Sequence, residues 1–221
     1  MIIGKRLGSP RNVDYPTFLK TVWADLSIPV ELVLPPVPVL DAMQHNGRWH
    51  EVFDAVSLNS DLLMSIHAPA ARLSTEAFRR WWSLCLDLSS RLGNVPATVH
   101  PEWSRKNRLD SDRQKFFDSL KDVGGQDLIG IETFGSPRRL FTPQAIIDLD
   151  LPMTLDIAHI HEKSRVMEII QKYSHKIRTV HLSSVAPDGR QHLPYDDFCV
   201  EVLEALNKKD WMGTVSLEYL P

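Results

Sequence analysis

The sequence has few of the features that mark secreted, membrane or nucleic-acid-binding proteins. It contains only two cysteines, Cys85 and Cys199, far apart among 221 residues, which excludes a disulfide framework and indicates buried thiols. No apolar run approaches the roughly 18 residues of a membrane-spanning helix, and no signal-peptide pattern opens the chain. The net charge of −3 provides no overall basic field for nucleic acid. We therefore expect a cytoplasmic protein without a membrane partner; the charge disfavours a nucleic-acid partner but does not exclude one.

No glycine-rich phosphate loop follows the first apolar segment, and no linker or low-complexity tract divides the chain. Short apolar segments alternate instead with longer amphipathic ones. The strand-like segments are residues 1–6, 29–34, 62–68, 96–101, 128–134, 152–158, 178–184 and 214–220. The helix-like segments are residues 15–26, 48–56, 74–93, 111–125, 142–149, 162–176 and 196–213.

This alternation predicts a parallel sheet covered by helices, and eight strands favour a (β/α)8 TIM barrel of the α/β class over a doubly wound sheet. We expect one domain over residues 1–221. The eighth predicted strand reaches the end of the sequence, so the barrel should lack its last helix. That absence would expose an apolar wall, for which a second copy in a homo-oligomer is a candidate cover.

Metal-competent side chains stand near the carboxyl ends of the predicted strands, which open on one face of such a barrel. They are Glu31, His67, His100, Glu132, Asp156, His181 and Glu218, with His159 and His192 in the loops that follow. Glu132 and Glu218 lie in the apolar segments GIETF and SLEYL, where an unpaired carboxylate costs several kcal/mol. Since we find no Lys or Arg at the buried strand ends to pair with them, the pattern predicts a bound cation.

Each of these residues also has an ordinary structural interpretation. A single histidine such as His67 is more often a hydrogen-bonded structural residue than a ligand. Histidines 45, 50, 161 and 175 lie in polar or helical segments and are expected to be solvated. Two basic segments, 103–108 and 136–139, are interpreted as solvated loops or as a phosphate grip, and Trp103 and Phe134 as packing or sugar-stacking residues.

The series SIHAP, ATVHP, GIETF, TLDIAHI, RTVHLSS and SLEYL resembles the xylose isomerase-like TIM barrel superfamily from about residue 29 onward. That superfamily contains sugar and sugar-phosphate isomerases and epimerases, and abasic-site nucleases of the endonuclease IV type. Its isomerase pattern implies one divalent ion (Mn²⁺, Zn²⁺, Co²⁺ or Mg²⁺), held by Glu132, Asp156, His181 and Glu218. It also implies that Glu132 and Glu218 form the acid–base pair and that His159 and Arg190 contact the substrate. We place His159 with these glutamates in the catalytic set and expect His67, His100, Arg190 and His192 to bind the substrate.

The nuclease pattern implies up to three zinc ions held by an overlapping set of residues. The first would be bound by His67, His100 and Glu132, the second by Glu132, Asp156, His181 and Glu218, and the third by His159 and His192 with an aspartate. The sequence departs from this pattern because Arg190 occupies the position of that aspartate. We therefore expect a metal-dependent isomerase or epimerase that acts through an enediolate, with the nuclease and a catalytically inactive metal-holding barrel as alternatives.

Overall fold

The structure, a computed structural model, describes residues 1–8, 13–69, 76–100, 109–134, 141–160, 162–186 and 188–218. Its strands are β1 (Ile2–Leu7), β2 (Val30–Val33), β3 (Leu63–His67), β4 (Ala97–Val99), β5 (Ile129–Glu132), β6 (Met153–Asp156), β7 (Ile177–Leu182) and β8 (Thr214–Leu217). They run parallel in chain order, and β8 pairs with β1 to close the barrel. All eight predicted strands are present, and the predicted TIM barrel is confirmed.

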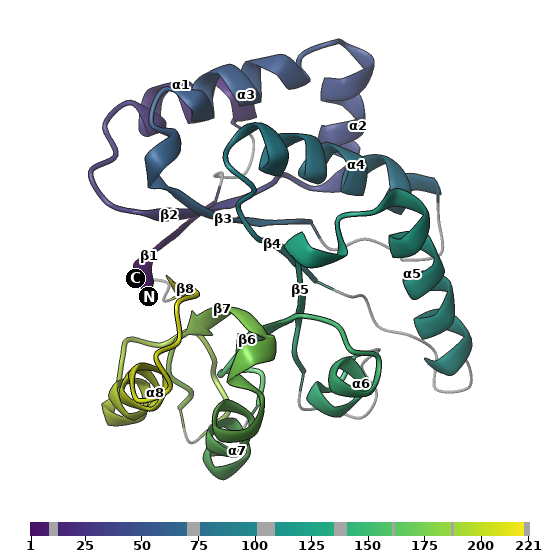
Figure 1. Cartoon of the computed structure of the whole chain (residues 1–221). Helices are drawn as coiled ribbons and strands as arrows, with labels where there is room; N and C mark the ends of the chain where they lie inside the picture. Colours follow the sequence, from purple (N-terminus) through teal and green to yellow (C-terminus); the bar gives the residue numbers. More distant parts are fainter. Residues whose placement is uncertain are drawn as a thin grey trace.

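The helices surround this barrel, as Figure 1 shows. They are α1 (Tyr15–Trp23), α2 (Val37–His45), α3 (Trp49–Ser57), α4 (Glu76–Arg91), α5 (Leu109–Val123), α6 (Pro143–Asp148), α7 (Lys163–Tyr173) and α8 (Asp197–Asn207). Helix α2 was not predicted, because Pro36 and Pro38 resemble a loop; proline is nevertheless tolerated in a first helical turn. The predicted helix over 196–213 is too long, since α8 ends at Asn207.

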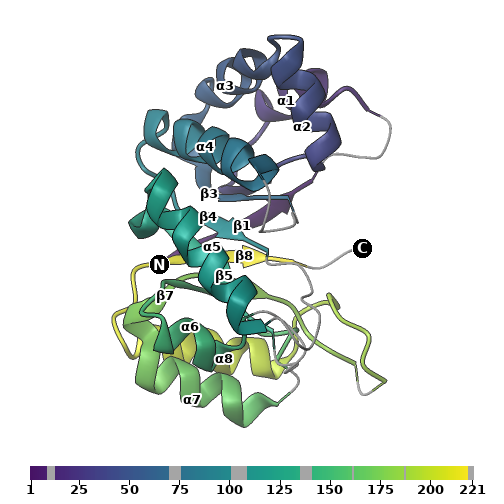
Figure 2. The same ribbon diagram turned by 90° about the vertical axis from the view of Figure 1, so that its right-hand side faces the viewer.

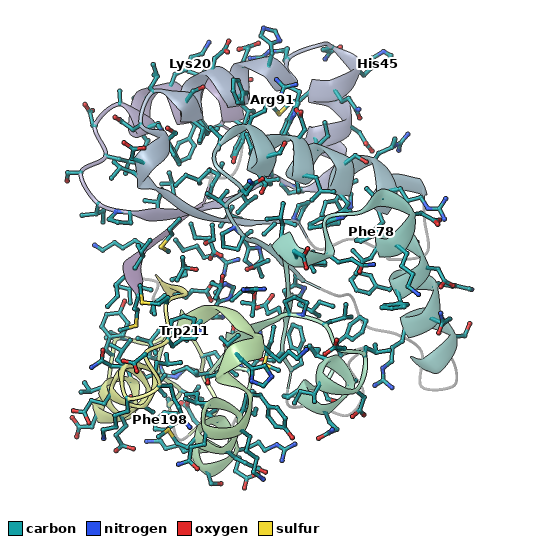
Figure 3. The ribbon with its side chains drawn as sticks, viewed as in Figure 1. Lys20, His45, Phe78, Arg91, Phe198 and Trp211 are labelled. Carbon is teal, nitrogen blue, oxygen red and sulfur yellow. The ribbon has the colours of Figure 1, made fainter. Side chains whose placement is uncertain are left out.

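Aromatic side chains fill the layer between strands and helices. Phe78 of α4 packs on Phe116 of α5 with ring centroids 5.4 Å apart, whereas the side chains of Lys20 and His45 lie on the outer surface (Figure 3). His50 and His175 are exposed like His45, which agrees with the expectation that these histidines are solvated.

The interior of the barrel is lined with hydroxyl groups as well as apolar side chains. The hydroxyls of Thr98 and Thr154 lie 3.0 Å apart, as do those of Thr179 and Thr214. Gly130 provides room for this layer, because a Cβ there would lie 2.4 Å from Thr154 Oγ1. The carboxyl ends of the strands therefore rest on a buried polar layer, which is compatible with charged groups above it.

In the described part of the chain, no helix follows β8. The apolar side chains of Ile2 and Ile3 on β1 are 49% and 44% exposed. Met212, just before the neighbouring strand β8, is 81% exposed. Coverage of this wall by a second copy stays a prediction. None of the described helices is long and apolar enough to cross a membrane.

Candidate metal centre at the carboxyl ends of the strands

His181 on β7 lies at the centre of a buried group of carboxylates. Its Nδ1 atom is 3.2 Å from Glu218 Oε1 and 3.5 Å from Glu132 Oε1. Oδ2 of Asp156 lies 3.9 Å from the same nitrogen. Glu132 and Asp156 are the last residues of β5 and β6, and Glu218 directly follows β8. The fold thus brings together the four side chains that the sequence suggested as ligands of one ion.

The other nitrogen of the His181 ring contacts a fourth carboxylate. Nε2 lies 3.2 Å from Oε1 of Glu31 on β2, and the same oxygen accepts a hydrogen bond from the Ser65 hydroxyl at 3.1 Å. Burial raises the pKa of Glu31, but His181 outweighs it and holds that pKa well below its usual range. An ionised carboxylate can only accept hydrogen bonds, so Glu31 keeps a proton on Nε2 of His181. This contact directs Nδ1 toward the other three carboxylates.

The charge on His181 depends on what occupies the centre. Burial lowers the pKa of its imidazole, yet the nearby carboxylates of Glu218 and Glu31 raise that pKa well above its ordinary value. The ring is therefore protonated when only protein groups surround it. A metal ion at Nδ1 would replace that proton, as ligation of histidine requires.

Glu132 is surrounded by imidazoles on both of its oxygens. Oε2 lies 3.6 Å from Nε2 of His67 and 3.7 Å from Nε2 of His100. Oε1 lies 3.5 Å from Nδ1 of both His159 and His181. Burial raises the pKa of the Glu132 carboxyl, but the contacts with His181 and His67 hold it well below its usual range.

The Asp-x-x-His step has a local structural cause. The backbone N–H groups of Ala158 and His159 donate to Asp156 Oδ1 at 2.8 and 3.0 Å, which folds the chain back after β6. The His159 ring consequently stacks on Phe134, with centroids 4.4 Å apart, and its Nδ1 lies 3.2 Å from Asp156 Oδ2. Burial lowers the pKa of His159 to about 4, so the ring is neutral near pH 7.

Asp156 experiences the opposite electrostatic environment. Burial, followed by repulsion from the charges of Glu218 and Glu132, raises the pKa of Asp156 well above its usual range. A divalent cation would relieve this repulsion, because it favours the ionised form of every carboxylate that it contacts.

His192 reaches the centre from the loop between β7 and α8, which projects beyond the strand ends in Figure 2. An antiparallel bridge between Ser184 and Leu193 closes the loop. His192 adopts a positive φ of 58°, and its Nδ1 lies 3.6 Å from Glu218 Oε2 and 3.5 Å from the Ser183 hydroxyl. The loop thus brings His192 beside Glu218.

Arg190 is not brought to the centre with the other predicted residues. The backbone N–H of Ala186 donates to the Arg190 carbonyl at 2.8 Å, and that of Gly189 to the Ala186 carbonyl at 2.9 Å. This tight turn places Arg190 at the exposed tip, where its guanidinium pairs with Asp188 at 2.9 Å. Its predicted role in substrate contact stays a prediction.

Arg6 was not among the predicted site residues, and the prediction that the buried strand ends contain no Lys or Arg is wrong. Arg6 lies near the carboxyl end of β1, and its Nη1 donates to Glu218 Oε1. Its side chain is 31% exposed, so the guanidinium borders both the carboxylates and the mouth of the barrel. The available signal was its place in the segment MIIGKR, which was itself predicted as a strand.

The donor atoms at the centre fit a divalent cation. Each of the four predicted ligands has one buried atom without a hydrogen-bond partner among the described residues: Glu132 Oε2, Asp156 Oδ2, His181 Nδ1 and Glu218 Oε2. Such atoms are costly when left unpaired, and carboxylate oxygens with imidazole nitrogen suit Mn²⁺, Co²⁺, Mg²⁺ and Zn²⁺.

Within the described residues, three sets of side chains have ligand atoms within 4.8 Å of one another. They are His67 with Glu132 and His181, Glu31 with His181 and Glu218, and Glu132 with Asp156 and His159. No set holds all four predicted ligands, so one ion bound by all four would require small side-chain movements. The basic segments 103–108 and 136–139, Trp103 and His161 lie outside the described residues.

Comparison with solved structures finds the same architecture in a protein described as a sugar phosphate isomerase/epimerase from Parabacteroides distasonis. The two are 14% identical with a TM-score of 0.50, over 99% of this chain and 92% of that one. Another structure with that description and organism is 10% identical, with a TM-score of 0.45 over 99% and 75% of the two chains. No family model and no curated protein matches the sequence. At this level of identity the likeness shows a shared fold, the closed barrel of eight parallel strands.

Proposed function

We propose that this protein is a divalent-metal-dependent isomerase or epimerase of a sugar or sugar phosphate, acting through an enediolate. The observation that supports this most directly is the convergence of three carboxylates, from β5, β6 and the end of β8, on Nδ1 of His181. Glu132, Asp156, His181 and Glu218 would hold one Mn²⁺, Co²⁺, Mg²⁺ or Zn²⁺ ion. The description of the structural neighbour as a sugar phosphate isomerase/epimerase agrees with this class of reaction.

When bound, the ion would polarise the substrate carbonyl and stabilise negative charge on its oxygen. Glu132 and Glu218, which approach His181 from strands separated by β6 and β7, would carry the proton. One carboxylate takes the proton from the carbon beside the carbonyl, the C–H electron pair forms a carbon–carbon double bond, and the carbonyl oxygen takes the charge. Return of a proton to the former carbonyl carbon, with the hydroxyl proton of the adjacent carbon passing to the other oxygen, gives the isomer. Return of a proton to the opposite face of the original carbon gives the epimer.

His159 has the properties of a group that binds substrate hydroxyls. Its ring is neutral above about pH 4 and held against Phe134, so it can accept or donate a hydrogen bond without adding charge. The rings of His67, His100 and His192 border Glu132 and Glu218 in the same way. We assign these histidines to substrate binding.

The test is proton exchange between substrate and solvent. Wild-type protein with added Mn²⁺ would be incubated in deuterium oxide with a panel of ketoses and ketose phosphates, and mass spectrometry would detect carbon-bound deuterium. We expect exchange that requires Mn²⁺ and falls at least about 10²-fold in Glu218→Gln, since general base catalysis contributes about 10²–10⁴-fold. Glu201→Gln, a matched change on the exposed face of α8, should retain the wild-type rate. Exchange that survives in Glu218→Gln would reject the role of this carboxylate.

One observation favours a multi-zinc phosphodiester hydrolase of the endonuclease IV type as a second candidate. The two oxygens of Glu132 face different pairs of histidines, as expected for a carboxylate that bridges two metal ions. Arg190 in place of an aspartate ligand weighs against the complete three-zinc set. About three zinc ions per chain together with cleavage of abasic DNA would favour the hydrolase. A bound ion without either activity would favour an inactive barrel.

A further inference from the structure

We propose that Arg6 is a positioning residue, whose guanidinium fixes one oxygen of Glu218 and acts as a permanent counter-cation of the centre. This inference rests on the proposed function, since it assigns Glu218 to proton transfer. It concerns a residue on β1, outside the set of acidic and imidazole groups that the sequence suggested.

The position of Arg6 follows from the way the barrel closes. β1 pairs with β8 on one side, with Lys5 opposite Leu217, and with β2 on the other, with Arg6 opposite Glu31. Arg6 follows Lys5, and Glu218 follows Leu217 at the end of β8, so Arg6 and Glu218 lie beside each other. Of the side chains on β1, that of Arg6 points to the carboxylates, whereas the preceding Lys5 is exposed.

The two oxygens of Glu218 have different surroundings because of this contact. Oε1 accepts the Arg6 hydrogen bond and also lies 3.2 Å from His181 Nδ1. Oε2 is buried, has no hydrogen-bond partner in the described part of the chain and lies 3.6 Å from His192 Nδ1. Arg6 thereby prevents the carboxylate from rotating and leaves Oε2 as the oxygen that exchanges a proton with substrate.

Arg6 also affects metal binding through charge. A guanidinium stays protonated at every working pH, so Arg6 always offsets part of the negative charge of the buried carboxylates. Arg6 donates to the Glu218 oxygen that lies 3.2 Å from His181 Nδ1, so an ion held beside His181 would lie close to the guanidinium, and two cations at close range repel each other. The wild-type centre should therefore bind its ion more weakly than a centre without Arg6, while it keeps Glu218 in a fixed orientation.

The primary test uses Mn²⁺ alone, with Arg6→Met, which keeps an unbranched stem and removes the charge. We expect at least a fivefold lower Kd for Mn²⁺ by calorimetry, together with a lower Tm of the metal-free protein, because Glu218 loses its partner. Damage to the fold would weaken Mn²⁺ binding instead, so the direction of the change distinguishes the two. Lys5→Met, which removes a charge from the exposed face of the same strand, should leave both values unchanged. An unchanged or raised Kd in Arg6→Met would overturn the proposal.

Arg6→Lys tests the positioning role, and it also covers the case in which Arg6→Met fails to fold. Lysine keeps the positive charge, so the Mn²⁺ Kd should stay within twofold of wild type. It lacks the planar guanidinium that holds the Glu218 carboxylate in one orientation. On a ketose that the wild type exchanges, kcat should fall at least tenfold with KM within threefold. A wild-type kcat in Arg6→Lys would overturn the positioning role.

The outcomes separate this inference from the proposed function. Wild-type protein that binds Mn²⁺ and exchanges a ketose, with an Arg6→Met Kd that is not lowered, would refute Arg6 alone. Wild-type protein that binds no Mn²⁺ would contradict the proposed function. In that case the inference still predicts that Arg6→Met gains Mn²⁺ binding, and absence of binding in both proteins would refute it too.

Discussion

The two ring nitrogens of His181 contact different carboxylates of the centre. Nε2 faces the buried carboxylate of Glu31, whereas Nδ1 faces Glu218 and Glu132. The segment RTVHLSS shows that a histidine stands near a strand end, and this was enough to predict its place. Which nitrogen faces which carboxylate depends on Glu31 of β2, which the sequence placed among the strand-end groups without indicating its contact with His181.

Arg6 and Arg190 show where residue-level prediction ended. Arg6 was missed because the predicted site was assembled from acidic and imidazole residues, although the strand that carries it was predicted. Arg190 was assigned to substrate contact from the family resemblance, and that assignment stays a prediction, whereas the structure pairs its guanidinium with Asp188 in the loop after β7. Spacing along a loop does not determine which residue reaches its tip, because that depends on backbone hydrogen bonds.

The lowered pKa of His159 predicts a pH-dependent stability in the metal-free protein. Its pKa is about 4 in the folded state against 6.5 ordinarily, so between these values the unfolded chain binds more protons. The stabilisation is complete above about pH 6.5 and is lost as the pH falls toward about 4. The free energy of unfolding, measured with urea from pH 4 to 7, should therefore rise more steeply in wild type than in His159→Gln. The raised pKa of His181 affects the pH dependence of unfolding in both proteins, so its contribution cancels in the difference between their curves. Parallel curves of unfolding free energy against pH for the two proteins would contradict the lowered pKa of His159.

At the scale of elements, the strands were easier to predict than the helices. Mainly apolar segments such as 128–134 and 152–158 indicate strands buried on both faces, and parallel strands place their ends together. This geometry explains why the convergence of Glu132, Asp156, His181 and Glu218 was predictable without any knowledge of loops. Helix α2 was not predictable in the same way, since its prolines are compatible with a loop until tertiary packing buries Leu40 and Met43.

Gly4 in β1 allows the close approach that places Arg6 beside Glu218. A Cβ at this position would lie 2.1 Å from the Pro29 carbonyl oxygen and 2.9 Å from Met64 Sδ. Since the backbone before β2 cannot move without disturbing the pairing of β1, Gly4→Ala should lower the free energy of unfolding by about 1–3 kcal/mol. Gly8→Ala is the matched control, because a Cβ there meets no atom within 4 Å. Equal urea midpoints for the two variants would show that β1 adapts to the extra methyl group.

At the scale of the whole molecule, closure of the barrel assembles the centre. Glu31 and Arg6 come from the first two strands, whereas Asp156, His181 and Glu218 come from the last three strands and the residue after them. Pairing of β1 with β8 brings these groups together, so the centre cannot form in either half of the chain alone. Binding of an ion should consequently stabilise the complete barrel by mass action.

The central claim is that Glu132, Asp156, His181 and Glu218 share one divalent cation, and metal content tests it most directly. Protein purified without chelator would be analysed by inductively coupled plasma mass spectrometry, alongside Asp156→Asn and the surface control Asp122→Asn. Our account predicts about one ion of Mn²⁺, Co²⁺, Mg²⁺ or Zn²⁺ per chain in wild type and control, with less than a tenth of that content in Asp156→Asn. A wild-type protein free of metal, or an Asp156→Asn protein with its full content, would contradict the account.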